Sequence, residues 1–198
     1  MRGMEKRKAL AALRARIEQS LRARGYLSWF FPPRDDGVRG WEGTAPVMLV
    51  ALNPSAGRRR GRKAPQNPGK LDAALSLLYD QMARNGLADA HLTDVSKAKA
   101  KNSEADVTLA ILAGVSKRWF LEEVRIIRPR LIIALERRAT TMLKAWLPGD
   151  PRLREVSNYS WAWRFRSRKL KSGITPLERF KREMKEMGLE ARDRRRVG

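Results

Sequence analysis

Two polar residues, each at the end of an apolar run typical of a buried strand, could orient a water molecule or transfer a proton. Asn53 opens the segment Asn-Pro-Ser behind the first run, and Asp94 closes the second run. An amide such as Asn53 can only orient water, whereas the Asp94 carboxylate can act as a general base or accept hydrogen bonds from a ligand. A structural interpretation is also open for each residue. Asn53 suits a turn ahead of Pro54, and Asp94 suits a strand-end acid paired with Lys97 or Lys99.

Three basic runs, each free of acidic residues, follow predicted strands. They comprise Arg58, Arg59, Arg60, Arg62 and Lys63; Lys97, Lys99 and Lys101; and Arg164, Arg166, Arg168, Lys169 and Lys171. Parallel strands deliver the loops that follow them to one edge of the sheet, so all three runs are expected at a common rim. A single run is adequately explained as a solvated loop, but three together favour a groove that binds nucleic acid.

The last basic run is interleaved with aromatic residues. Tyr159, Trp161, Trp163 and Phe165 occupy alternate positions. A period of two predicts either a further strand with one aromatic face or a loop that offers stacking surfaces and a wedge beside phosphate contacts. Packing in the core is an equally good interpretation for each tryptophan. We assign Trp161 to the predicted nucleic-acid surface.

The composition narrows the classes of function. The 198 residues include 43 Lys and Arg against 21 Asp and Glu, a formal net charge of +22, and a polyanion is the usual partner of such an excess. The chain has no cysteine and a single histidine, His91, so a thiolate or histidine metal site, a disulfide and a Ser-His-Asp triad are not expected. We therefore expect no metal and no cofactor.

The chain also lacks the features of a membrane or exported protein. No apolar stretch reaches the roughly 18 residues of a membrane span, and no signal peptide is recognisable. We expect a cytoplasmic, nucleoid-associated monomer whose partner is DNA or RNA.

The elements that must position these residues alternate between strands and helices. Strands are predicted over 47–53, 91–95, 131–136 and 153–158, and helices over 10–24, 71–85, 104–127, 137–146 and 174–187. This alternation predicts an α/β fold with a central, mainly parallel sheet of about four strands flanked by helices. We expect a single domain over residues 1–189, with a basic tail over 190–198.

Three motifs, in their order along the chain, resemble the uracil-DNA glycosylase superfamily. They are "VMLVALNPSAG", "AHLTDVSKAKAKNSEAD" and "FLEEVRIIRPRLIIALERRATTML", and together they cover Val47 to Leu143. The resemblance implies a three-layer fold and a DNA glycosylase, an enzyme that hydrolyses the N-glycosidic bond of a flipped, deaminated or damaged base such as uracil.

The resemblance also implies roles for individual residues. Asn53 would orient the attacking water, while the base pocket and the contacts to the leaving base would come from Pro54, Ser55, Asn158, Tyr159 and Ser160. Asp94 stands where the family has an Asn that reads the pyrimidine edge, and an ionised carboxylate accepts but cannot donate. Either the substrate differs, or Asp94 is protonated, or Asp94 is the general base. The iron–sulfur cysteines and the histidine of the family's third motif are absent.

Two other functions are compatible with these residues. The missing histidine and asparagine favour a non-catalytic nucleic-acid-binding protein on the same fold. An enzyme acting on a nucleotide or another phosphate ligand would explain one basic loop, but not three.

Overall fold

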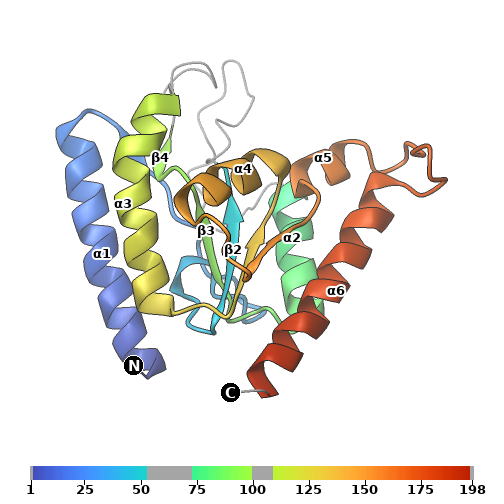
Figure 1. Ribbon diagram of the computed structural model, residues 1–198, viewed down its shortest axis with the longest axis horizontal. Helices are drawn as coiled ribbons and strands as arrows, with labels where there is room; N and C mark the ends of the chain where they lie inside the picture. The colour runs from blue at the N-terminus through green and yellow to red at the C-terminus, as the bar shows by residue number, and fades with distance from the viewer. Residues whose placement is uncertain (1, 53–72, 100–108, 197–198) are drawn as a thin grey trace.

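The computed structural model describes residues 2–52, 73–99 and 109–196 (Figure 1). Its helices are α1 (Gly3–Ala23), the short 3-10 helix η1 (Gly40–Glu42), α2 (Ala73–Arg84), α3 (Leu109–Ile127), α4 (Arg137–Trp146), α5 (Tyr159–Arg164) and α6 (Pro176–Arg196). Its strands are β1 (Leu27–Ser28), β2 (Val47–Ala51), β3 (His91–Asp94), β4 (Ala98–Lys99), β5 (Leu131–Ala134) and β6 (Leu153–Glu155).

The central sheet has four strands in the order β3-β2-β5-β6, and every pairing is parallel. Ala51 at the end of β2 is level with Asp94, and Ala134 at the end of β5 is level with Glu155. The predicted α/β fold with a parallel sheet of about four strands is therefore confirmed. A separate antiparallel pair, β1 with β4, was not expected from the sequence.

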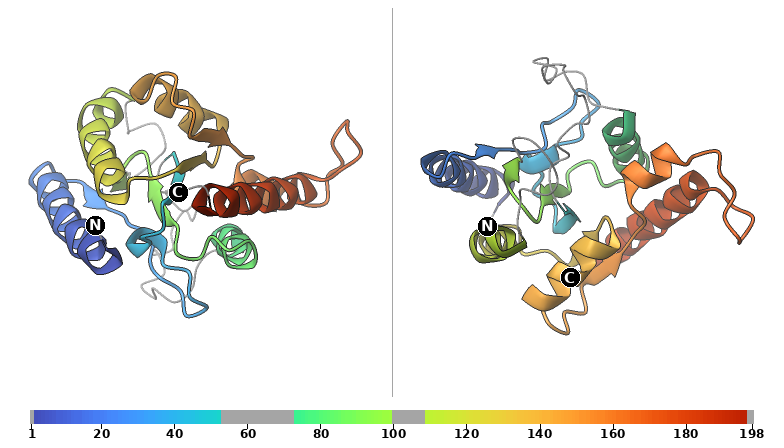
Figure 2. Two further views of the ribbon diagram at one scale, coloured as in Figure 1. Left: turned by 60° about the horizontal axis from the view of Figure 1, so that its bottom comes forward. Right: turned by 90° about the horizontal axis from the view of Figure 1, so that it is seen from above.

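Helices cover both faces of the sheet, which explains why its strands are continuously apolar. Every residue of β2 is buried, and alternate residues face opposite sides: Leu49 packs in one hydrophobic cluster and Val50 in the other. The Leu49 side is covered by α2, α5 and α6, and the Val50 side by α1, α3 and α4 (Figure 2).

The C-terminal helix is longer than the sequence pattern predicts. We expected a helix to residue 187 and a basic tail from 190, but α6 continues to Arg196 and buries Ala191. The reason is tertiary: Arg194 donates to the carbonyl oxygen of Arg130 at 2.7 Å, and Arg130 donates to that of Arg194 at 2.8 Å. These bonds hold the end of α6 against the residue that precedes β5.

The aromatic and basic run after β6 does not form a strand, and its first six residues do not form a loop; only its second half lies in a connection, between α5 and α6. Residues 159–164 form the helix α5, because Asn158 caps its first turn: the Asn158 Oδ1 accepts a hydrogen bond from the Trp161 backbone N–H at 2.9 Å. The predicted fourth strand accordingly ends at Glu155, before this cap.

Candidate functional site

Three polar residues lie along the carboxyl edge of the sheet: Glu136 and Asn158 line one pocket there, whereas Asp94 lies on β3, at the far end of the strand order, and does not line that pocket. Asp94 ends β3, Glu136 lies two residues beyond β5, and Asn158 lies three residues beyond β6. The strand ends are held level by backbone bonds, such as Leu135 N–H to Val50 at 2.8 Å and Val156 N–H to Ala134 at 2.9 Å. Ligands of open parallel sheets bind at this edge, so these side chains form the candidate site.

Asp94 is the most unusual of these residues. Its side chain is only 2% exposed, and neither carboxyl oxygen accepts a hydrogen bond from any described residue. Burial raises the pKa of Asp94 to about 8, with Glu123 and Glu136 adding to the shift and Lys97 opposing it. At neutral pH the carboxyl is therefore predominantly protonated, which makes it a donor and an acceptor rather than a general base.

Lys97 does not belong to the basic rim in which the sequence placed it. Its side chain is 2% exposed, and its ammonium group is bound by three acceptors. Nζ lies 2.6 Å from Thr93 Oγ1, 2.9 Å from Glu123 Oε1 in an ion pair, and within hydrogen-bond distance of the Asp94 backbone oxygen. An ammonium has three hydrogens, so this lysine has none to offer a phosphate or the Asp94 carboxyl. The predicted pairing of Asp94 with Lys97 through their side chains is thus wrong.

Glu123 connects Lys97 to the single histidine. Its Oε2 lies 3.2 Å from His91 Nε2, while His91 Nδ1 donates to the backbone oxygen of Trp41 at 2.7 Å. Burial raises the pKa of Glu123, but Lys97 and His91 outweigh it, and the pKa lies below its ordinary value. Both ring nitrogens of His91 are therefore engaged in a buried network at the start of β3, the end of the strand opposite Asp94.

A signal for Glu123 was present in the sequence. Glu123 shares a helix face with Phe120 and Ile127, three residues before it and four after it, and both of these are buried. A carboxylate on an apolar helix face predicts a buried cationic partner.

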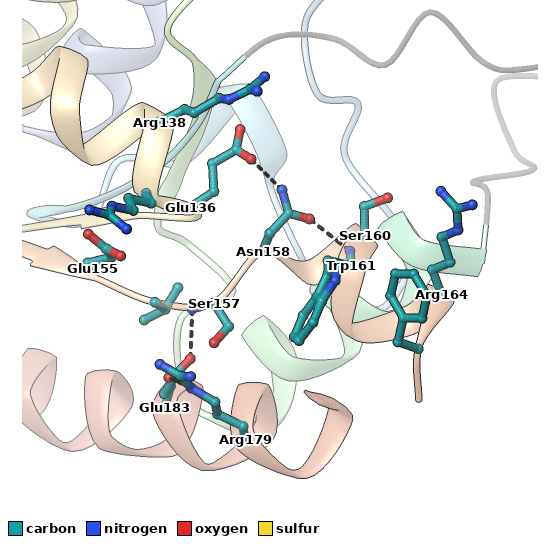
Figure 3. Close-up of a pocket in the computed structure, with 13 residues that line it drawn as sticks. Glu136, Arg138, Glu155, Ser157, Asn158, Ser160, Trp161, Arg164, Arg179 and Glu183 are labelled. Atoms are coloured by element: carbon teal, nitrogen blue, oxygen red, sulfur yellow. Dashed lines mark hydrogen bonds and ion pairs between the residues drawn. The ribbon is translucent and has the colours of Figure 1, made fainter. Parts of the chain in front are cut away.

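Asn158 is held by two protein groups. Besides capping α5, its Nδ2 donates to Glu136 Oε2 at 2.5 Å (Figure 3). The preceding Ser157 N–H donates to Glu183 Oε2 at 2.7 Å, and Glu183 forms an ion pair with Arg179 at 2.8 Å. The turn between β6 and α5 is thereby fixed on both sides.

A pocket of about 630 Å³ opens beside this turn, between the ends of β5 and β6 and the helices α4, α5 and α6. The sequence-predicted residues Asn158, Ser160, Trp161 and Arg164 all line it (Figure 3). Tyr159 does not, because it packs against the hydrophobic core.

The pocket carries exposed aromatic surface and charges of both signs, since Glu136, Glu155 and Glu183 line it beside four arginines. Trp161 is 40% exposed and lies against Phe165, with ring centroids 5.7 Å apart. Arg137, Arg138 and Arg164 also line the pocket, and none of them forms an ion pair with the described part of the chain. A base or sugar could stack on the rings while the guanidinium groups contact phosphate.

The remaining predicted nucleic-acid contacts are divided by the structure. Arg166, Arg168 and Lys169 are exposed in the connection from α5 to α6, which projects from the body of the protein (Figure 1). Arg166 stacks on Trp163, 4.5 Å from the ring centroid. The other predicted site residues lie outside the described residues: Asn53, Pro54, Ser55, Arg58, Arg59, Arg60, Arg62, Lys63 and Lys101. For Lys99, only the backbone in β4 is described.

Metal-binding clusters and membrane-spanning helices are both absent from residues 2–52, 73–99 and 109–196. No group of three or more His, Cys, Asp or Glu side chains there could hold a metal ion. No helix there has the length and apolar character needed to cross a membrane.

Comparison of the sequence with known proteins does not identify a family for this chain. No family model matches the chain, and no curated protein matches it.

The burial of Asp94 predicts how stability depends on pH. Because its pKa is raised from 3.8 to about 8, the folded state binds one more proton than the unfolded state between these values. The free energy of unfolding should fall by about 1.4 kcal/mol per pH unit in this window, relative to Asp94→Asn, and the difference should level off above pH 8. Urea denaturation of both proteins from pH 5 to 9 measures it, and parallel curves would contradict the prediction.

The buried Glu123 pair predicts a large effect of a small substitution. Glu123→Gln leaves the Lys97 ammonium buried without its carboxylate and should lower the free energy of unfolding by about 3–5 kcal/mol. Glu18→Gln is the matched control, because Glu18 pairs with Arg14 on the exposed face of α1 and should cost under about 1 kcal/mol. Similar urea midpoints for the two variants would show that the buried pair has no special weight.

Proposed function

We propose that this protein is a DNA glycosylase that hydrolyses the N-glycosidic bond of a flipped, deaminated or damaged base, such as uracil. The observation that carries the proposal is the buried carboxyl of Asp94 at the carboxyl edge of the sheet, without a hydrogen-bond donor among the described residues. An unpartnered polar group in the interior is costly, and such groups concentrate where a ligand supplies the missing partner.

Hydrolysis of the glycosidic bond requires one site that binds the flipped base and another that binds the sugar–phosphate backbone of the DNA. A water oxygen forms a bond to the sugar C1′ as the bond from C1′ to the base nitrogen breaks, and a proton from the water ends on the departing base. Asp94 provides hydrogen bonds to the base edge. Asn53 is proposed to orient the water on the strength of the family resemblance alone. The exposed Trp161 and the arginines around the pocket would hold the flanking strand.

A second candidate function is a nucleic-acid-binding protein without catalysis. The hydrogen bonds of Asn158 favour this second function. The amide already donates to Glu136 and accepts from the backbone N–H of Trp161, so it is poorly placed to assist a leaving base. The buried Lys97 also removes one cation from the predicted rim.

An excision assay separates the two functions. Single- and double-stranded oligonucleotides carrying uracil, hypoxanthine, xanthine or a mismatch are incubated with the protein, and abasic sites are then cleaved with alkali. We expect strand cleavage at the altered base, reduced about 10- to 100-fold in Asp94→Ala through the loss of hydrogen bonds to the base, and abolished in Asn53→Ala. Tight binding without cleavage on any substrate would instead establish the non-catalytic protein.

A charge reversal tests which surface meets the nucleic acid. Arg164→Glu should weaken binding to all sequences alike by about tenfold and lower the slope of log K against log salt by about 1–2, because phosphate contacts release counterions and carry no sequence information. Arg125→Glu is the control, since Arg125 is exposed in the last turn of α3, at the opposite end of the sheet (Figure 1). Equal effects of both reversals, measured by fluorescence anisotropy, would argue against a defined interface.

A further inference from the structure

The side chain of Asp94 lies on the opposite side of β3 from the buried ion pair. Alternation along the strand directs His91 and Thr93 toward α3, and it directs Leu92 and Asp94 toward the cluster beneath α2, α5 and α6. Lys97 follows Thr93 to the α3 side and reaches Asp94 only at its backbone oxygen. Within residues 2–52, 73–99 and 109–196, the carboxyl is therefore left in an apolar setting with no cation bonded to it.

Burial favours the neutral form of Asp94, and the charged and titratable groups around it in the described part of the chain act in both directions. They are Tyr79 from α2, Lys97 from the turn after β3, Glu123 from α3 with its partner His91, and Glu136 from the turn after β5. Burial is the largest cause of the raised pKa of Asp94; among the described residues the Lys97 ammonium lowers this pKa, and the carboxylates Glu123 and Glu136 raise it. Tyr79 cannot donate to Asp94, because its hydroxyl donates to the backbone oxygen of Pro32 at 2.7 Å.

We propose that Asp94 works as a neutral carboxylic acid and binds ligand edges that carry a hydrogen-bond donor next to an acceptor, in either order. This inference rests on the proposed function and names the substrate class of the same site. It replaces the general-base role that the sequence left open, since a neutral acid has no free carboxylate to take a proton from water.

The chemistry of the neutral carboxyl explains the breadth of this class. Uracil and hypoxanthine present a ring N–H beside a carbonyl oxygen, whereas cytosine presents a ring nitrogen acceptor beside an amino group. A carboxylic acid offers one O–H donor and one C=O acceptor. No described residue holds either Asp94 oxygen as an acceptor, so the proton can occupy whichever oxygen the ligand requires.

The ability of the neutral carboxyl to pair with either order of donor and acceptor has a consequence for selectivity, and its burial has one for access. Asp94 does not distinguish uracil from cytosine, so that selection must come from the ease of flipping and from the leaving ability of the base. The carboxyl is also 2% exposed, so a base reaches it only by displacing the groups that cover it.

The first test observes the proton directly. Infrared difference spectra between the native protein and Asp94→Asn should show the C=O band of a protonated carboxyl at pH 7, which disappears on titration through about pH 8. A carboxylate band at pH 7 would overturn the inference.

The second test measures base binding without cleavage. Oligonucleotides carrying 2′-fluorinated deoxyuridine or deoxycytidine, whose glycosidic bonds resist hydrolysis, are titrated against the protein at pH 6.5 and 9.5, with an abasic analogue as reference. Deoxycytidine does not titrate between these pH values, so the base-dependent part of its affinity should fall about 30-fold at the higher pH, following the neutral fraction of Asp94. Deoxyuridine loses its own ring proton near the higher pH and is therefore compared at pH 6.5 only, where both bases should bind. Asp94→Asn keeps a neutral donor and acceptor, so its affinity for deoxycytidine should not change between these pH values.

The outcomes separate this inference from the proposed function. A pH-independent affinity in the native protein, or no base-dependent binding at all, overturns the inference, even if excision is observed. Base-dependent binding with the expected pH response supports it, and if native protein then excises no base, the proposed function fails while the inference stands.

Discussion

A buried carboxylate on α3 organises the chain around β3. Glu123 contacts both Lys97 and His91, and His91 in turn bonds the backbone of Trp41 in η1. A charge in the interior is tolerated only with a partner, so none of these groups can be removed singly without exposing the others to a large desolvation cost. The network ties together α3, β3, the turn that follows β3 and the helix η1.

The position of Asp94 follows from this network. Because Lys97 is drawn toward Glu123, the turn after β3 folds back on Thr93, and no cation of the described residues bonds the carboxyl of Asp94. Two buried carboxyls near one strand therefore have opposite properties: the pKa of Glu123 is lowered and that of Asp94 is raised. Environments that push the pKa values of neighbouring acids apart are typical of sites that perform acid–base chemistry or bind ligands.

The large positive charge of the chain is used in two different ways. Some cations are structural, as Arg194 is in fixing the end of α6 and Arg179 is in holding Glu183 beside the turn after β6. Others, such as Arg138 and Arg164, line a pocket that also holds glutamates, but form no ion pair within the described residues. Cations of the second kind are available to bind a polyanion, and they line the same pocket as the exposed Trp161.

The sequence by itself determined the α/β class, the parallel sheet and the limits of α4, because buried strands and amphipathic helices leave periodic apolar patterns that are local. The partners of buried charges are not local. Glu123 lies 26 residues beyond Lys97 in the numbering, and only the packing of α3 on the sheet decided that this lysine belongs to the interior and not to the rim. The same limit applies to the aromatic run after β6. Its alternation predicted a strand or a loop, but the cap supplied by Asn158 and the packing of Ala162 in the core made it a helix. The sequence thus placed Asp94 at the carboxyl edge, and the tertiary structure decided its protonation, since burial and the distribution of nearby charge depend on elements from the whole chain.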